Sequence, residues 1–126
     1  MKKTLLLFLL PCILQAQTPR LVVPVGHTAF VSSVAFSPDG KQVLTGSGDK
    51  IAILWDLSGR ELQSFMGHIS GISSVAFSPD GQRVLTGSDD KTAILWDLKG
   101  NKLQSFIGHI DGISSVAFSP DGQSVL

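Results

Sequence analysis

Histidine, aspartate and hydroxyl residues recur along this chain at a fixed interval, and together they are the residue types of a base, an orienting acid and a nucleophile. Gly-His occurs at 26–27, 67–68 and 108–109, and Trp-Asp occurs at 55–56 and 96–97, each 41 residues after the previous copy. A nucleophilic site needs one such set. Here the set is copied from unit to unit and includes a tryptophan, which has no part in that chemistry. The pattern therefore favours a structural role, and we expect no enzyme activity and no catalytic residue.

The same spacing argues against a metal or cofactor site. No two histidines are four residues apart, and no Asp-x-Asp-x-Asp-Gly loop is present. The single cysteine, Cys12, rules out a cysteine cluster. Phosphate-binding and dinucleotide-binding glycine motifs are also missing from the sequence. We predict no metal and no cofactor.

Composition indicates one folded domain with no affinity for nucleic acid. The chain has 126 residues, of which 43% are hydrophobic and 16% are charged. Such a composition is typical of a globular domain rather than a disordered segment. Ten Lys and Arg balance ten Asp and Glu, with no basic block. A nucleic-acid-binding surface needs clustered positive charge, so we predict that nucleic acid is not a partner.

The chain after its first residues is one unit repeated. Residues 27–67 and 68–108 are identical at 29 of 41 positions, and residues 68–85 and 109–126 differ at only two of 18. The first unit predicts four short strands, at 31–37, 42–47, 52–56 and 61–65, because apolar and β-branched runs alternate with turn signals. One such signal is Ser-Pro-Asp-Gly at 37–40, which is typical of a type I turn. No segment has a helical period, so we predict an all-β fold.

Gly-His, Ser-Pro-Asp-Gly and Trp-Asp at a period near 40 resemble the WD40 repeat family. The resemblance covers roughly residues 20–126 and implies β-propeller blades, each a four-stranded sheet. It implies two complete blades, at 27–67 and 68–108, and part of a third at 109–126. Residues 17–26 are then a lead-in, in which 20–25 resembles the closing strand of a propeller.

The family joins four side chains of each blade in a hydrogen-bonded tetrad: His before the first strand, Ser or Thr on the second, Asp in the following turn and Trp on the third. Carried over, the resemblance implies two tetrads, His27, Thr45, Asp49 and Trp55 in the first unit and His68, Thr86, Asp90 and Trp96 in the second. The hydroxyls of Ser47 and Ser88 compete for the place of the two threonines. The donors and acceptors of such a set satisfy one another, which predicts a rigid blade.

Differences between the units fall mainly beside turns, and loops on a rigid scaffold are where recognition resides. Phe30, which is glycine in the second unit, is our first candidate for a contact with a partner. Packing of Phe30 against a neighbouring blade is an equal alternative. The full set of candidate contacts is Thr28, Phe30, Lys50, Ile69, Asp89 and Lys91.

The first 16 residues are typical of a secretory signal peptide. Lys2 and Lys3 precede an eleven-residue apolar run, and Ala16 marks the expected cut. A membrane span needs about 20 apolar residues, so this run is too short to be one. The short signal resembles bacterial ones, and it predicts a secreted or periplasmic protein.

A closed propeller needs at least four blades, and this sequence predicts fewer than three. The chain is then the first part of a longer propeller, or copies of it assemble into a ring through exposed blade faces, or it is a partly disordered remnant. The first is our preferred interpretation. We therefore predict a non-catalytic scaffold that binds an unidentified protein. The alternative is the N-terminal sensor portion of a larger propeller-containing enzyme, such as a caspase-like peptidase.

Overall fold

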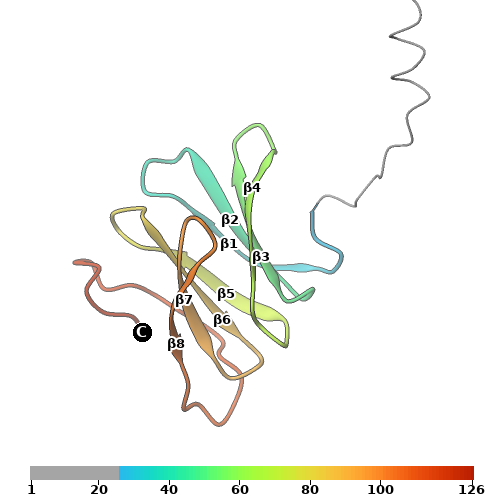
Figure 1. Cartoon of the computed structure of the whole chain (residues 1–126), viewed down its shortest axis with the longest axis vertical. Helices are drawn as coiled ribbons and strands as arrows, with labels where there is room; N and C mark the ends of the chain where they lie inside the picture. Colours follow the sequence, from blue (N-terminus) through green and yellow to red (C-terminus); the bar gives the residue numbers. More distant parts are fainter. Residues whose placement is uncertain (1–25) are drawn as a thin grey trace, which may run out of the picture.

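The structure is a computed structural model that describes residues 26–126; the predicted signal peptide and residues 17–25 of the lead-in lie outside this range. Eight strands form two sheets (Figure 1). The first sheet contains β1 (Val31–Phe36), β2 (Gln42–Ser47), β3 (Ile51–Asp56) and β4 (Glu61–Met66). The second contains β5 (Ile72–Phe77), β6 (Arg83–Ser88), β7 (Ala93–Asp97) and β8 (Lys102–Phe106). The predicted all-β fold is confirmed, and the four strands predicted for the first unit agree with β1–β4 to within one residue at each end.

Each sheet is an antiparallel meander in which neighbouring strands are consecutive in sequence. The β1–β2 and β3–β4 turns therefore lie at one end of the first sheet. The β2–β3 turn lies at the other end, together with the segment that leads into β1. The second sheet repeats this arrangement, including its bulges at equivalent positions. We call the end with the β2–β3 and β6–β7 turns the loop end, and the opposite end the hairpin end.

The Ser-Pro-Asp-Gly turn closes the first hairpin as its sequence predicts. The amide of Gly40 donates to the carbonyl of Ser37 across 2.9 Å, which is the hydrogen bond of a β-turn. Oδ1 of Asp39 accepts from the Ser37 hydroxyl at 2.6 Å and from the amide of Lys41 at 3.0 Å. Gly40 has a φ of +72°, a conformation that side chains with a Cβ rarely adopt.

The two sheets pack face to face (Figure 1), and buried apolar side chains of both sheets form one core between them. Leu44, Leu54 and Phe65 of the first sheet meet the second sheet, whose buried side chains include Ile72 and Trp96. Gly46 lets the sheets approach closely, because a Cβ there would lie 2.6 Å from Cγ2 of Ile72. The strictly repeated glycine on β2 and β6 is thus a packing requirement.

Residues 109–126 cover the far face of the second sheet without forming a named strand. Val116 is buried in a second core cluster with Leu85 and Ala93, and Phe118 forms an isolated antiparallel bridge with Val125. The segment repeats the Ser-Pro-Asp-Gly turn, in which the amide of Gly122 donates to the carbonyl of Ser119 at 2.9 Å.

The outer face of the first sheet has no such cover within residues 26–126. Val34 is 56% exposed on β1, whereas its repeat equivalent Val75 on β5 is 6% exposed, because the first sheet packs over Val75. Phe36 is likewise 65% exposed. In the part of the chain that the structure describes, no helix has the length and hydropathy needed to cross a membrane.

Candidate functional site

The two predicted tetrads are brought together by strand register. On β2 and β3, Thr45 is opposite Ile53 and Val43 is opposite Trp55. The indole of Trp55 thus lies diagonally across from Thr45, within reach of its hydroxyl. The same register holds on β6 and β7 for Thr86 and Trp96.

In the first sheet the four side chains form a continuous hydrogen-bonded chain. Nε1 of Trp55 donates to Oγ1 of Thr45 at 2.8 Å, and Nε2 of His27 lies 2.7 Å from the same oxygen. Nδ1 of His27 lies 2.9 Å from Oδ2 of Asp49. Because a carboxylate only accepts, Nδ1 carries the proton, and the Thr45 hydroxyl can donate to Nε2. Every member of the chain is satisfied.

The second tetrad has the same connections and is more deeply buried. Trp96 donates to Thr86 at 2.9 Å, and His68 lies 2.8 Å from Thr86 and 2.7 Å from Asp90. Trp96 is 1% exposed, because Phe65 of the first sheet packs edge-on against its ring at 5.7 Å between centroids. Trp55 is only half-buried, since its face of the first sheet is the one without a cover in residues 26–126.

Each tetrad aspartate also accepts hydrogen bonds from backbone amides at its own loop end. Oδ2 of Asp49 accepts from the amide of Thr28, and Oδ1 accepts from the amide of Ile51. Asp90 makes the equivalent bonds to Ile69 and Thr92, and gains a further one from the Thr92 hydroxyl at 2.6 Å. Thr92 stands where the first unit has Ile51, and its hydroxyl thus gives the second aspartate an extra donor.

Hydrogen bonding keeps both tetrad aspartates ionised. Burial acts to raise the pKa of Asp90, but hydrogen bonds from the Thr92 hydroxyl, His68 and the amide of Ile69 outweigh it and lower that pKa to about 2. The pKa of Asp49 is also lowered, by the amide of Thr28 and by His27, against the same effect of burial.

Ser47 and Ser88, the competing hydroxyls, have a different role. The Ser47 hydroxyl donates to the carbonyl of Ala29 at 3.2 Å and accepts from the amide of Asp49 at 3.1 Å. Ser88 does the same with the carbonyl of Ser70 and the amide of Asp90. These fully buried serines therefore join the segment before the first strand to the turn after the second. The structure places the threonines, not the serines, next to the histidines.

Sequence reasoning missed two serines that connect neighbouring units. The amide of Val75 donates to the hydroxyl of Ser33 at 3.1 Å, and the hydroxyl of Ser32 donates to the carbonyl of Ile72. Ser73 and Ser74 make the same bonds to residues 113 and 116. The signal was present in the sequence, because the Ser-Ser pair is identical in all three units, but a repeat does not say which neighbour its side chains reach.

The candidate partner contacts are all exposed at the loop end: Thr28, Phe30, Lys50, Ile69, Asp89 and Lys91. Phe30 is 75% exposed and Ile69 is 80% exposed. The ring of Phe30 lies over Gly48 of its own sheet, where a Cβ would come within 2.9 Å of it. Lys50 and Lys91 have positive φ values of 76° and 74°, which the tight turns impose on them.

The loop end of the first unit approaches that of the second at Gly48 and Gly71. A Cβ on Gly71 would be 3.2 Å from the Cα of Gly48. In the first unit Phe30 lies over Gly48. In the second unit the equivalent positions hold Gly71 and Asp89, so each unit has one glycine and one larger residue at this pair of positions. Within residues 26–126, no group of three or more His, Cys, Asp and Glu side chains is placed to hold a metal ion.

Comparison with known proteins identifies three repeats. The family model described as "WD domain, G-beta repeat" matches residues 19–56, 59–97 and 100–126. Each of the first two matches ends at a Trp-Asp pair, so the second match starts before β4 and crosses from the first sheet into the second.

Several curated proteins share short stretches with the chain. The small ribosomal subunit protein RACK1z of Arabidopsis thaliana is 50% identical over 40 residues, which cover 31% of this chain and 12% of that protein. The Notchless protein homolog of the same plant is 59% identical over 32 residues, or 25% of this chain and 7% of that protein. Protein HIR1 of Kluyveromyces lactis is 46% identical over 37 residues, or 29% and 4%. The aligned stretches thus span no more than about an eighth of these relatives.

Proposed function

Because the chain belongs to the WD40 repeat family, we propose that it is a non-catalytic scaffold that binds another protein through the loop end of its sheets. The observation that carries this proposal is the contrast between a fixed interior and exposed loop side chains. Two satisfied tetrads hold the turns, while Phe30 and Ile69 remain 75% and 80% exposed above them. Large apolar side chains on a rigid support favour protein binding.

Burial of the tetrads argues against catalysis by them. The side chains of His27 and Asp49 are 6% and 5% exposed, and those of His68 and Asp90 are 0% and 5% exposed. A base that acts on a substrate must reach the proton that it removes. These imidazoles already bond on both nitrogens inside the blade. Their role in our proposal is to hold the loop end in one conformation.

Replacing the exposed loop side chains should abolish partner binding without unfolding the sheets. We expect the triple variant Phe30→Ser, Lys50→Glu and Asp89→Lys to lose at least about tenfold in the capture of a specific protein by the immobilised chain. Capture is measured by quantitative mass spectrometry and then repeated with the captured protein purified. The control variant changes three exposed hairpin-end and outer-strand positions, Ser58→Thr, Lys99→Glu and Leu103→Ser. Equal loss in both variants, or in neither, contradicts binding through the loop end.

Self-association through the outer face of β1 is a further part of this proposal. Val34 and Phe36 are 56% and 65% exposed there, and exposed apolar sheet faces favour association. The same experiment includes a purified second copy of the chain as the binding protein. Binding that survives the loop variant but not Val34→Thr assigns the contact to this face.

We also propose that the protein is exported, to the periplasm or outside the cell. The support is the Lys-Lys-led apolar segment that ends at Ala16. The intact mass of exported protein should correspond to a chain that starts near Gln17. A mass that includes Met1 would contradict cleavage. The alternative proposal is that the chain is the N-terminal sensor portion of a larger propeller-containing enzyme. The curated relatives named above are themselves far longer than their aligned stretches.

A further inference from the structure

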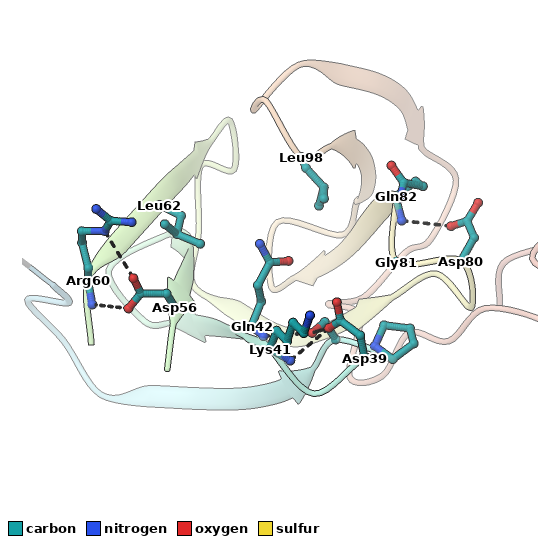
Figure 2. A pocket seen from close by; sticks show the side chains of 12 residues that line it. Asp39, Lys41, Gln42, Asp56, Arg60, Leu62, Asp80, Gly81, Gln82 and Leu98 are labelled. Carbon is teal, nitrogen blue, oxygen red and sulfur yellow. Dashed lines mark hydrogen bonds and ion pairs between the residues drawn. The ribbon is translucent and has the colours of Figure 1, made fainter. Parts of the chain in front are cut away.

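A groove at the hairpin end separates the two sheets (Figure 2). Its volume is about 440 Å³, and it is lined by the Ser-Pro-Asp-Gly turns of both units and by the β3–β4 turn. Asp39 and Gln42 line it from the first unit, Asp80 and Gly81 line it from the second, and Leu62 and Leu98 form an apolar wall. The groove is far along the strands from the loop end, so it is distinct from the contacts proposed above.

The equivalent junction between the second and third units shows which side chain fits the groove. Between the second and third units, the position of Gln42 is taken by Arg83. Its Nη2 donates to the carbonyl of Gly122 at 2.9 Å, and its guanidinium carbon lies 5.8 Å from the centre of the Phe118 ring. The chain thus fills the equivalent junction with its own guanidinium.

Between the first and second units that guanidinium is missing. Gly81 and Phe77 occupy the positions of Gly122 and Phe118, but the residue that would reach them is the shorter, neutral Gln42. A Cβ on Gly122 would lie 3.8 Å from Arg83, whereas a Cβ on Gly81 would meet only Pro38. Within residues 26–126, no side chain donates to the Gly81 carbonyl, which leaves an acceptor open to the groove.

The turn aspartates beside the groove keep oxygens that can accept from a guanidinium. Asp39 and Asp80 each use Oδ1 for the amide and hydroxyl of their own turn. Oδ2 of each makes no hydrogen bond within the described residues. Lys41 is an opposing charge at this edge, and Arg60 is already paired with Asp56 at 3.2 Å. Lys41 acts on Asp39, and Arg83 lies close enough to Asp80 to add to the hydrogen bonds that lower its pKa, so these charges balance. The Oδ2 atoms of the two aspartates remain available as acceptors.

We propose that this groove binds an arginine side chain of a protein partner, with its guanidinium donating to the Gly81 carbonyl and facing the carboxylates of Asp39 and Asp80. The planar fork of five N–H donors can bond a carbonyl and a carboxylate together, which a single ammonium does less well. Leu62 and Leu98 pack along the aliphatic stem. The inference deepens the proposed scaffold function and rests on it for the nature of the partner.

The test uses short peptides on the ¹⁵N-labelled chain. Acetyl-Ala-Arg-Ala-amide should shift the amide resonances of Gly81 and Lys41 saturably, with a dissociation constant on the order of 1 mM. The lysine peptide should bind at least about fivefold more weakly. Free L-arginine should bind no more tightly than the arginine peptide. Tighter binding of the free amino acid would assign the groove to a small molecule and overturn the proposal.

Two variants with the same charge change locate the binding. Gln42→Arg places in the first junction the side chain that fills the second, so it should weaken arginine-peptide binding at least about tenfold. Gln104→Arg, on exposed β8, adds the same charge outside the groove and should leave binding unchanged. Absence of shifts at Gly81, or equal binding by both variants, overturns the inference. The peptide titration tests the groove alone. If the peptide does not bind, the capture experiment on the loop end still tests the scaffold function separately.

Discussion

The Trp96→Phe variant should lose about 3 kcal/mol of its free energy of unfolding, because a buried indole is truncated and a buried hydroxyl loses its donor. Trp96 is 1% exposed and packs on Phe65, and its Nε1 donates to Thr86. Phenylalanine keeps an aromatic ring there but leaves a cavity and supplies no N–H. Urea denaturation followed by circular dichroism measures the loss.

The first sheet offers a matched control. Trp55 makes the same bond to Thr45 at 2.8 Å but is only half-buried. Trp55→Phe should therefore cost about half as much as Trp96→Phe, since less packing is lost and water can reach the hydroxyl. An unchanged midpoint for Trp96→Phe would show that the tetrad does not stabilise its blade. Equal losses at the two sites would show that burial does not set the size of the effect.

Acidification should destabilise the chain through Asp90, by about 2 kcal/mol between pH 4 and pH 2. The pKa of Asp90 is lowered from 3.8 to about 2 in the folded chain. A group with a lowered folded pKa contributes its full stability above its unfolded pKa. That stability is lost as the pH falls through the folded pKa. Unfolding free energies measured across this range, with an NMR titration of the Asp90 carboxyl, give both quantities.

The Thr92→Ile variant isolates this effect from the other carboxylates. It removes the hydroxyl that donates to Asp90 and recreates the residue found at position 51. The pKa of Asp90 should rise, and part of the acid-sensitive stability should disappear. The reverse change, Ile51→Thr, should lower the pKa of Asp49 further. An Asp90 titration that is the same with and without the Thr92 hydroxyl would refute this account.

Most of the fold could be predicted from the sequence, because the sequence of each strand in the first unit recurs in the second. Strands β1–β4 follow the predicted ranges to within one residue, and the Ser37-to-Gly40 turn bond follows from proline and glycine at fixed turn positions. Such features depend on local backbone preferences, which a residue carries wherever it is placed.

The candidate sites could be predicted only in part. Residue types named the members of each tetrad, but both Thr45 and Ser47 offered a hydroxyl on the same strand. Strand register decided between them, since Trp55 lies within reach of Thr45 while Ser47 faces the segment before β1. The hairpin-end groove was not predicted, because residues of two units line it. It also depends on Gln42 being shorter than Arg83, the residue that reaches across the equivalent junction.

The sequence by itself determined the repeat, the four-stranded unit and the set of polar residues that bond inside it. The tertiary structure alone decided which copy is buried. Trp55 and Trp96, or Val34 and Val75, are the same residues in the same local setting, yet they differ widely in exposure. The physical reason is that local structure comes from the chain's own neighbours in sequence, whereas burial comes from whichever surface packs on top. Closely similar units therefore acquire different burial and different open surfaces.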